Sequence, residues 1–218
     1  MTERTSAYWD EYYSFGRPEI EEPSSFARAC HARIEPGQLL FELGCGNGRD
    51  ALFFADQGVN VVACDQSTVA IAKLSGRPDL DRFRHRPRFL PADFAALPEV
   101  HRGELDFIYS RFSMHAATAS AASAALAWSA AGLRPGGALL IEARSVRGSL
   151  YGRGVAVAGE RDAFFYDGHY RRFLRSEELT AELTTLGLTI DELVEAAGLA
   201  VFKDDDPVVI RVIATRPR

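Results

Sequence analysis

The chain has 218 residues and a formal net charge of −5, with 47% hydrophobic and 25% charged residues. That length fits one domain with a sizeable core, and the composition is typical of a globular protein, which argues against a disordered chain and against a coiled coil. The acidic balance argues against broad binding to nucleic acid or to a membrane surface, because both need a large area of positive charge.

The chain carries three cysteines, Cys30, Cys45 and Cys64. Because their number is odd and their spacing fits no zinc pattern, the sequence disfavours a disulfide framework and fits a reducing compartment. The first residues mix both signs of charge and lead into no apolar stretch, so we expect no signal peptide. No window approaches the roughly 18 apolar residues of a membrane span. We therefore expect a cytoplasmic protein without a membrane segment.

The N-terminal segment, residues 1–35, has a helical pattern that is rich in aromatic side chains. From about residue 38 the pattern alternates between strands and helices, which predicts an α/β protein with a mostly parallel sheet. The expected strands are Leu39–Leu43, Val59–Cys64, Arg88–Leu90, Leu105–Ser110, Ala138–Ala143, 188–195 and 208–215. The expected helices are Arg49–Gln57, Ser67–Leu74, 116–131 and a further one that Ser176 caps.

A long insert, residues 144–175, interrupts this alternation and shows only weak periodicity. Ordered loops of that length are uncommon and tend to be functional. The insert contains seven arginines against three acidic residues, and its aromatic residues argue against disorder. We expect a single domain, residues 1–218, in which the insert forms a substrate lid and residues 1–35 form an N-terminal helical cap.

The most informative segment joins the first expected strand to the first helix after it. It reads Leu39-Leu-Phe-Glu42-Leu-Gly44-Cys-Gly46-Asn-Gly48-Arg49. Three glycines let the backbone approach a ligand closely, and the N-terminus of the following helix offers unpaired N–H groups. Taken alone, the glycines could form only a tight turn. Asp65, which ends the second strand, could likewise be only a helix N-cap.

Two other kinds of glycine-rich site fit this segment poorly. A dinucleotide fingerprint needs Gly or Ala at the position where this chain has Arg49. No Lys-Ser/Thr pair follows the glycines, which excludes a phosphate-binding P-loop. The acid Glu42 lies in the strand itself, two residues before Gly44.

On these motifs the sequence resembles the class I S-adenosylmethionine-dependent methyltransferases, over roughly residues 37–143 and 176–216. The family's first motif, an acid followed by Gly-x-Gly-x-Gly, is matched by Glu42, Gly44, Gly46 and Gly48. Its second acid, which ends the next strand and binds the ribose hydroxyls, is matched by Asp65, and the acid near the adenine amine by Asp93. The fourth strand and the turn before the fifth also match, in Leu105–Ser110 and Leu133-Arg-Pro-Gly136-Gly137.

This resemblance implies a Rossmann-like fold with a seven-stranded, mostly parallel sheet, an antiparallel last strand and helices on both faces. It implies S-adenosylmethionine as cofactor and S-adenosylhomocysteine as product. Carboxylates suit this ligand, because charge-assisted hydrogen bonds from a diol or an ammonium to a carboxylate are strong. The cofactor-binding residues that the resemblance implies are Glu42, Gly44, Cys45, Gly46, Asn47, Gly48, Asp65, Gln66, Asp93, Phe94, Ser110 and Arg111.

Two histidines are candidate catalytic residues. His115 follows the fourth strand, at the carboxyl edge where α/β sheets bind ligands. It could be a general base that accepts the proton of the nucleophile, or it could cap the next helix or line the cofactor pocket. His169 lies in the insert beside a tyrosine and two arginines, and both a catalytic and a structural role are open for it.

The arginines of the insert predict the kind of methyl acceptor. Arg144 directly follows the fifth strand, and Arg171 and Arg172 stand together in the insert. Since guanidinium groups bind flat anions in a bidentate way, we expect these three to bind an anionic or sugar-phosphate-like acceptor. An arginine-rich, solvated surface is the alternative.

The aromatic residues of the N-terminal segment are at helical spacing, which usually indicates packing. In the family that the chain resembles, a leading helix commonly closes over the cofactor. Tyr12 or Tyr13 could then contact the sulfonium by cation–π attraction, and we count both with the substrate-binding residues.

We therefore expect methyl transfer to an oxygen or nitrogen of a small, anionic or sugar-like metabolite, mainly through proximity and orientation. No cluster with divalent-metal spacing lies near the fourth strand, so we expect no metal site. One alternative is a nucleic-acid or protein methyltransferase, which would want an extended basic face or an added recognition domain. The other is a cofactor-binding regulatory module without transfer activity. The sequence leaves the oligomeric state open.

Overall fold

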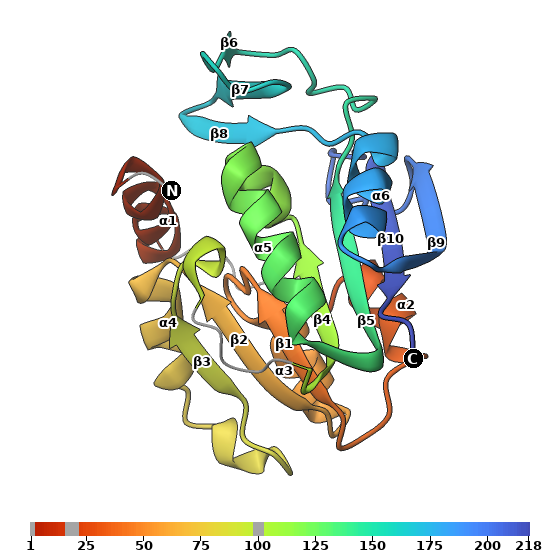
Figure 1. Cartoon of the computed structure of the whole chain (residues 1–218). Helices are drawn as coiled ribbons and strands as arrows, with labels where there is room; N and C mark the ends of the chain where they lie inside the picture. The colour runs from red at the N-terminus through yellow and green to blue at the C-terminus, as the bar shows by residue number, and fades with distance from the viewer. Residues whose placement is uncertain (1–2, 16–21, 98–102) are drawn as a thin grey trace.

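Seven strands form one sheet in the order β3-β2-β1-β4-β5-β10-β9 (Figure 1). The computed structural model describes residues 3–15, 22–97 and 103–218. Strand β10 runs antiparallel to both β5 and β9, and the other neighbouring strands pair in parallel. The predicted sheet with an antiparallel last strand is confirmed. Its strands are β1 (Leu39–Leu43), β2 (Asn60–Asp65), β3 (Arg88–Pro91), β4 (Leu105–Arg111), β5 (Leu133–Arg144), β9 (Thr189–Ala196) and β10 (Val209–Thr215).

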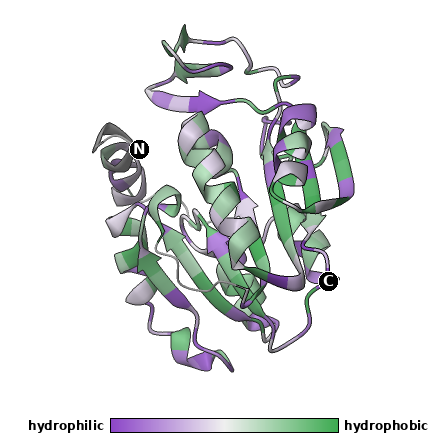
Figure 2. Ribbon diagram, viewed as in Figure 1, coloured by the Kyte–Doolittle hydropathy of each residue, from purple (hydrophilic) through white to green (hydrophobic). Residues whose placement is uncertain are grey.

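Helices cover both faces of this sheet (Figure 1). Helices α2 (Ser25–His31), α3 (Arg49–Asp56) and α4 (Thr68–Ser75) enclose one apolar core against one face. Helices α5 (Ala119–Gly132) and α6 (Ser176–Thr185) enclose the other. Strands of a parallel sheet that is covered on both sides are apolar along their whole length, and the central strands in Figure 2 are accordingly hydrophobic.

The order of the strands reverses next to β1. Strand β1 pairs with β2 on one side and with β4 on the other. At such a reversal the connections leave the sheet toward opposite faces, which opens a crevice beyond the carboxyl ends of the two strands. The three-residue helices η2 (Phe94–Ala96) and η3 (Met114–Ala116) follow β3 and β4 at this edge, and η1 (Leu80–Arg82) precedes β3.

Strand β5 is longer than the sequence predicts, since it begins at Leu133 rather than Ala138. A Cβ on Gly137 would lie 2.8 Å from the carbonyl oxygen of Leu105. Residues 133–137, which the sequence predicts to be a turn, therefore run directly alongside β4. The pairing of the two strands is irregular between Leu105 and Phe107. Glycine allows this close approach of two backbones.

The predicted cap of α6 is wrong. Arg175 precedes the helix without a side-chain capping bond, and Ser176 is the first helical residue. The Ser176 hydroxyl instead donates to Glu195 Oε2 of β9 at 2.9 Å. A tertiary partner thus takes the side chain that would otherwise cap the helix.

The insert forms a small antiparallel sheet of β6 (Val155–Ala156), β7 (Ala163–Tyr166) and β8 (His169–Arg172), here called the lid sheet. It lies beyond the carboxyl edge of the main sheet, and α1 (Glu3–Ser14) lies on the same side of the molecule (Figure 1). Strands of two to four residues are too short to show a periodicity in sequence. Residues 16–21 of the N-terminal segment lie outside the described residues. Within the described ranges, no helix has the length and apolar character that crossing a membrane requires.

Candidate active site

The turn between β1 and α3 is held by the end of β2. Gly44, Gly46 and Gly48 have φ of 72°, 56° and 74°, a region that favours glycine. The Gly46 N–H donates to Asp65 Oδ2 at 2.8 Å, and the Ser67 N–H donates to Asp65 Oδ1 at 2.9 Å. The side chain that caps α4 is Ser67. Asp65 therefore shapes the glycine turn and is not the cap of the next helix.

Glu42 brings a buried carboxylate to this turn. It is 4% exposed, and within the described chain its Oε2 atom has no hydrogen-bond partner. Burial raises the pKa of Glu42 well above its usual range, and the carboxylates of Asp50 and Asp65 add to this effect, while Arg111 and Arg49 oppose it. Because buried polar atoms are normally paired, the free oxygen marks a position for a ligand donor.

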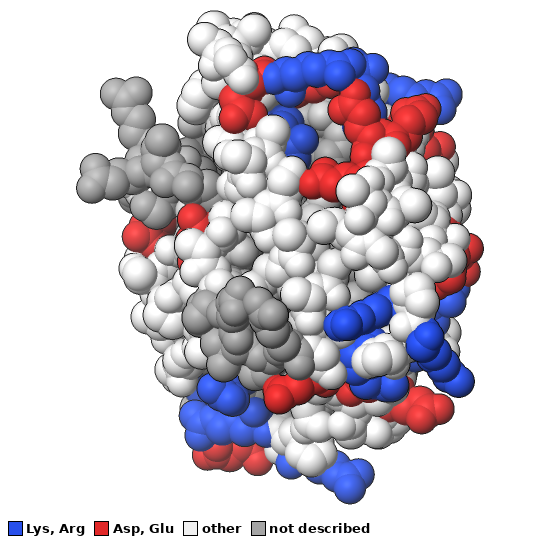
Figure 3. All heavy atoms as spheres, in the orientation of Figure 1, with Lys and Arg blue, Asp and Glu red and all other residues white. Residues whose placement is uncertain are grey.

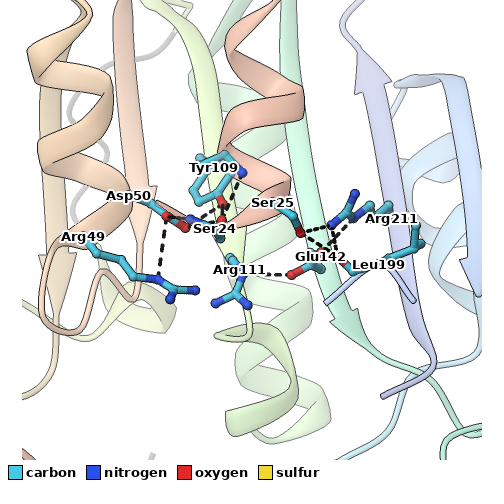
Figure 4. A network of polar contacts seen from close by, with 10 residues as sticks. Ser24, Ser25, Arg49, Asp50, Tyr109, Arg111, Glu142, Leu199 and Arg211 are labelled. Carbon is cyan, nitrogen blue, oxygen red and sulfur yellow. Dashed lines mark hydrogen bonds and ion pairs between the residues drawn. The ribbon is translucent and has the colours of Figure 1, made fainter. Parts of the chain in front are cut away.

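Two guanidinium groups face the same region. Arg49 opens α3 and Arg111 ends β4, and Figure 4 shows both side chains reaching toward the space beyond the strand ends. Burial lowers the pKa of Arg49, and the positive charge of Arg111 lowers it further. Together with Glu42, this arrangement complements a zwitterion, because an ammonium fits the carboxylate and a carboxylate fits the guanidiniums.

A row of charged residues crosses the sheet beside Arg111. Glu142 of β5 pairs in register with Arg111 of β4 and with Arg211 of β10. Arg111 Nε lies 2.8 Å from Glu142 Oε1, and Arg211 Nε donates to Glu142 Oε2 at 2.7 Å (Figure 4). Glu142 is fully buried, so its charge is balanced by two cations that the sheet itself holds in place.

A second polar cluster fixes the start of α3. Asp50 accepts hydrogen bonds from the Ser24 N–H at 2.7 Å, the Ser24 hydroxyl at 2.8 Å and the Tyr109 hydroxyl at 2.8 Å. These residues come from the α2 N-cap, from α3 and from β4 (Figure 4). Their bonds anchor the helix that begins with Arg49.

Four site residues were not predicted from the sequence, namely Arg49, Asp50, Glu142 and Arg211. Arg49 served there only to exclude a dinucleotide site. A usable signal exists for Glu142 and Arg211, since each is a lone charge inside an apolar strand. Buried charges of this kind are retained only when they are paired.

Helix α1 lies over the glycine turn. A Cβ on Gly46 would overlap with the Tyr13 hydroxyl, so this phenol sits directly on the turn. Burial, and next the charge of Asp65, raise the pKa of Tyr13 well above its usual value. Two further hydrogen bonds join α1 to α4. Asp10 accepts from the Ser67 hydroxyl at 2.7 Å, and Lys73 Nζ donates to the Tyr13 carbonyl at 2.5 Å.

The two predicted histidines come together beside this helix. His115 in η3 and His169 in β8 are both buried, and no partner among the described residues bonds His115 Nδ1. Burial lowers the pKa of His115 well below its usual value, and the charges of Arg144, His169, Arg171 and Arg111 act in the same direction. Burial also lowers the pKa of His169 to about 4, with Arg171 and Arg144 contributing. Both imidazoles are therefore neutral near pH 7.

The three predicted arginines divide into two groups. Arg144 and Arg171 face the histidines. Arg144 Nη2 donates to Asp205 Oδ2 at 2.5 Å, whereas Arg171 bonds only the Tyr166 carbonyl, at 2.8 Å, within the described residues. Arg172 lies on the opposite face of β8, since side chains alternate along a strand, and it donates to the Ala117 carbonyl at 3.3 Å. The structure therefore brings two of the three to the histidines.

Charges on the rest of the lid are mostly paired. Figure 3 shows cationic and acidic side chains alternating on that part of the surface. Arg161 pairs with Glu178 at 2.7 Å, and Arg175 with Asp162 at 2.9 Å. The surplus of arginine in the insert is thus partly neutralised by carboxylates. Arg153, Arg171 and Arg172 have no carboxylate partner in the described part of the chain, and among these three Arg171 is the one that faces the histidines.

The remaining predicted site residues line the same edge of the sheet. Asp93 caps η2 by accepting from the Ala95 N–H at 2.9 Å. Ser110 is buried at the end of β4, and its hydroxyl lies 2.6 Å from that of Ser113. Cys45 and Phe94 are also buried, while Asn47 and Gln66 are half-buried in the loops after β1 and β2. Tyr12 packs edge-on against Trp9 and Tyr13 within α1.

A sheet of this order, with an acid–glycine turn at its reversal and a second acid ending the next strand, defines the class I methyltransferase fold. Residues 40–137 match a protein family described as a methyltransferase domain. A demethylmenaquinone methyltransferase from Beutenbergia cavernae is 34% identical over 107 residues, which cover 49% of this chain and 40% of that protein. The matched region thus spans less than half of that relative's length.

Solved structures show the same fold over nearly the whole chain. One is the 1,6-didemethyltoxoflavin-N1-methyltransferase of Burkholderia thailandensis, with a TM-score of 0.72 and 18% identity over 99% of this chain and 88% of that one. Another is an S-adenosylmethionine-dependent methyltransferase of Methanosarcina mazei, with a TM-score of 0.74 and 16% identity over 87% of this chain and 97% of that one. The chain thus resembles the class I S-adenosylmethionine-dependent methyltransferases, in sequence over residues 40–137 and in fold over nearly its whole length.

The residues at the turn fit the cofactor of that family, S-adenosylmethionine. The free, buried Oε2 of Glu42 and the facing guanidiniums of Arg49 and Arg111 complement its amino-acid end. Asp65 uses one lone pair of each oxygen on a backbone N–H, and each carboxylate oxygen has a second one for a ribose hydroxyl. Glu42 and Asp65 thus have the capacity that the sequence analysis assigns to them.

Proposed function

We propose that this protein transfers a methyl group from S-adenosylmethionine to an oxygen or nitrogen of a small anionic acceptor. One observation carries the proposal. Beside the glycine turn, the guanidiniums of Arg144 and Arg171 and the neutral imidazoles of His115 and His169 converge at the carboxyl edge of the sheet. This arrangement supports a site for a negatively charged molecule that loses a proton on methylation.

The bound cofactor supplies a methyl group on a positively charged sulfur. Glu42, Arg49 and Arg111 would hold its amino-acid end, and Asp65 its ribose. The acceptor would then lie toward η3 and β8, where the histidines are. Helix α1, with Tyr13 on the turn, would serve as the cap that keeps water from the cofactor.

Arg144 and Arg171 would orient the acceptor through its anionic group. A guanidinium presents several donors in one plane, which fixes both the position and the angle of a carboxylate or a phosphate. Arg171 favours this role because it bonds only a carbonyl oxygen among the described residues. Positioning of this kind accounts for about 7–11 kcal/mol of rate enhancement in well-oriented reactions, and the transfer needs little other chemistry from the chain.

His115 would accept the proton that the nucleophile releases. Its lowered pKa keeps the ring neutral, so a nitrogen lone pair is available near pH 7. Its Nδ1 atom is buried without a partner in the described residues, and a bound acceptor would supply one. His169 is neutral as well, but two rings of α1 pack against it, which favours a role in shaping the pocket.

Two measurements on the 218-residue chain test the proposal. Calorimetry should show binding of S-adenosylhomocysteine and none of NAD; the reverse result would overturn the cofactor assignment. Transfer of a labelled methyl group should then be measured on matched pairs of small molecules, such as phosphate monoesters against their parent alcohols and carboxylates against amides. Label should enter the anionic members, and equal labelling of the neutral members would refute the acceptor class.

The matched variants are Arg171→Gln and Arg161→Gln, which remove one lid cation each. Arg171 faces the histidines, whereas Arg161 pairs with Glu178 on the outer side. Only Arg171→Gln should raise KM for an anionic acceptor, by roughly tenfold, since a charge-assisted hydrogen bond contributes about 1.5–3 kcal/mol.

A further inference from the structure

The backbone at Phe112 has a conformation that an aromatic residue rarely adopts. Its φ is 55°, in the left-handed region that bulky side chains avoid. The other non-glycine residues with positive φ in the described part of the chain are Asp162, Asp167 and Lys203. Phe112 follows β4 directly, at the edge where the site lies. Strain of this kind persists where the surroundings enforce it, often at functional sites.

Neighbouring contacts enforce this conformation. The Phe112 N–H donates to the Glu142 carbonyl at 2.9 Å, which ties it to β5. The hydroxyls of Ser110 and Ser113 lie 2.6 Å apart across the turn. Ser113 also packs against the glycine turn. A Cβ added to Gly44 would lie 2.6 Å from the Cβ atom of Ser113. These contacts hold the chain on both sides of the left-handed residue.

The strained backbone directs the Phe112 ring between three functional side chains. The guanidinium carbon of Arg111 lies 4.3 Å from the ring centroid, and that of Arg144 lies 5.4 Å from it. The His115 ring packs edge-on, with centroids 5.2 Å apart and an angle of 68° between planes. Cations are attracted to the face of an aromatic ring, so one ring orients two guanidiniums and an imidazole.

Each guanidinium is fixed from a second side by a carboxylate. Arg111 Nε lies 2.8 Å from Glu142 Oε1, and Arg144 Nη2 bonds Asp205 Oδ2 at 2.5 Å. A ring on one side and a carboxylate on the other define the direction in which the remaining donors point. Among the aromatic and cation–π contacts of the described residues, Phe112 is the one side chain that contacts all three of Arg111, Arg144 and His115.

We propose that Phe112 is a positioning residue that sets the orientation of Arg144 and His115 toward the acceptor and of Arg111 toward the cofactor. It acts through these three side chains and not on the reacting atoms. The inference rests on the proposed methyl transfer, because it assumes that Arg144 binds the anionic group and that His115 accepts the proton.

The test compares Phe112→Leu, Phe112→Gly and Phe112→Tyr in the 218-residue chain. Leucine keeps the bulk but loses the aromatic face. Glycine removes the ring and relieves the backbone strain. Tyrosine keeps the ring and is the conservative rescue. The readouts are the affinity for S-adenosylhomocysteine, the affinity for inorganic phosphate as an anion probe, and the NMR titration of the His115 ring.

In the leucine and glycine variants, a cooperative thermal transition should show that the chain is folded. S-adenosylhomocysteine should bind about two- to threefold more weakly, because Arg111 loses the ring but keeps Glu142. Phosphate should bind at least fivefold more weakly. The titratable groups that face His115 are Arg144, His169, Arg171 and Arg111. The pKa of His115 should rise, because two of the cations among them, Arg144 and Arg111, lose the orientation that the ring gives them. Phe112→Tyr should match the wild-type protein in all three readouts.

The proposal is overturned if Phe112→Leu and Phe112→Gly keep both the phosphate affinity and the His115 titration of the wild-type chain. A wild-type chain that fails to bind phosphate overturns its anion-binding part. Failure of the wild-type chain to bind S-adenosylhomocysteine would refute the proposed function instead, while the phosphate and His115 readouts still decide the role of Phe112.

Discussion

Tyr8 of α1 stacks on His169 of the lid sheet, with ring centroids 4.8 Å apart and an angle of 19° between the planes. The same helix bonds Ser67 through Asp10 and places Tyr13 on Gly46. One short helix therefore contacts the lid sheet, the glycine turn and the start of α4. In the proposed function, α1 would therefore contact both the cofactor side and the acceptor side of the site.

The first prediction concerns this stack. Tyr8→Ala removes the ring and should loosen α1, since an aromatic pair contributes about 0.5–1.5 kcal/mol. Amide hydrogen exchange in residues 7–14 should then be roughly two- to tenfold faster, and S-adenosylhomocysteine should bind more weakly by a similar factor. Tyr8→Phe keeps the ring and is the control. Equal exchange in both variants would show that the stack does not hold the helix.

The second prediction concerns pH. The pKa of His169 is about 4 in the folded chain and about 6.5 in an unfolded one. Between these values the unfolded chain binds a proton that the folded chain does not, so the free energy of unfolding falls as pH drops from 6.5 to 4. His169→Phe keeps a ring for Tyr8 and removes this proton. Chemical denaturation across that range should show a pH slope smaller by one proton, and an unchanged slope would contradict the prediction.

Much of the fold was accessible from sequence because its signals are local. Strand β1 matches its predicted bounds, and β2 and β10 begin within one residue of theirs. Each is a run of apolar residues between glycine, proline or polar residues. The lid sheet could not be predicted this way, because strands such as β6 have two residues and depend on tertiary packing.

The site was predictable where one motif encodes it and hidden where distant segments meet. Glu42 and Asp65 stand in a recognisable pattern, and both lie at the glycine turn. The pairing of Glu142 with Arg111 and Arg211 depends on strand register, which the sequence alone does not specify. The role of Phe112 depends on its positive φ. An aromatic residue in the sequence does not predict that backbone conformation.

The third prediction separates the two acids of the cofactor site. The pKa of Glu42 is raised, so the folded chain holds its proton to higher pH than the unfolded chain does, and stability falls as pH rises through that interval. Glu42→Gln should therefore raise Tm at pH 7.5, by about 2–4 °C for each kcal/mol of burial cost that is removed. It should also weaken S-adenosylhomocysteine binding by roughly 10–100-fold, because the charged partner is lost.

Asp65→Asn should differ from Glu42→Gln in the sign of its effect on Tm. Burial raises the pKa of Asp65 too, but two backbone N–H groups donate to its oxygens and oppose the rise. An amide group has only one oxygen to accept with, so one of these N–H groups would lose its partner. This variant should lower both Tm and the affinity for S-adenosylhomocysteine. Thermal denaturation and calorimetry on the two variants provide the comparison, and equal signs for the change in Tm would refute it.

The fourth prediction concerns the anchor of α3. Tyr109 is fully buried and its hydroxyl donates to Asp50 Oδ2 at 2.8 Å. Tyr109→Phe removes one of three donors to a buried carboxylate, which should cost about 1–3 kcal/mol of stability. Each kcal/mol corresponds to about 2–4 °C in Tm for a domain of this size. Phe54→Leu, a change in the same core without loss of a hydrogen bond, is the control for packing.

The last prediction concerns competition for Arg144. Asp205 bonds this guanidinium at 2.5 Å, so in the proposed site a carboxylate of the chain itself occupies a donor that an anionic acceptor would use. Asp205→Asn removes the charge but keeps the size of the side chain and one acceptor oxygen, which can still hold Arg144 in place. Inorganic phosphate should then bind about two- to fivefold more tightly, in line with about 0.2–1 kcal/mol for a partly exposed ion pair. Asp204→Asn changes the net charge equally at a neighbouring exposed position and is the matched control. An equal gain in both variants would mean that only long-range charge matters, and a loss of phosphate affinity in Asp205→Asn would mean that Asp205 is needed to hold Arg144 in place.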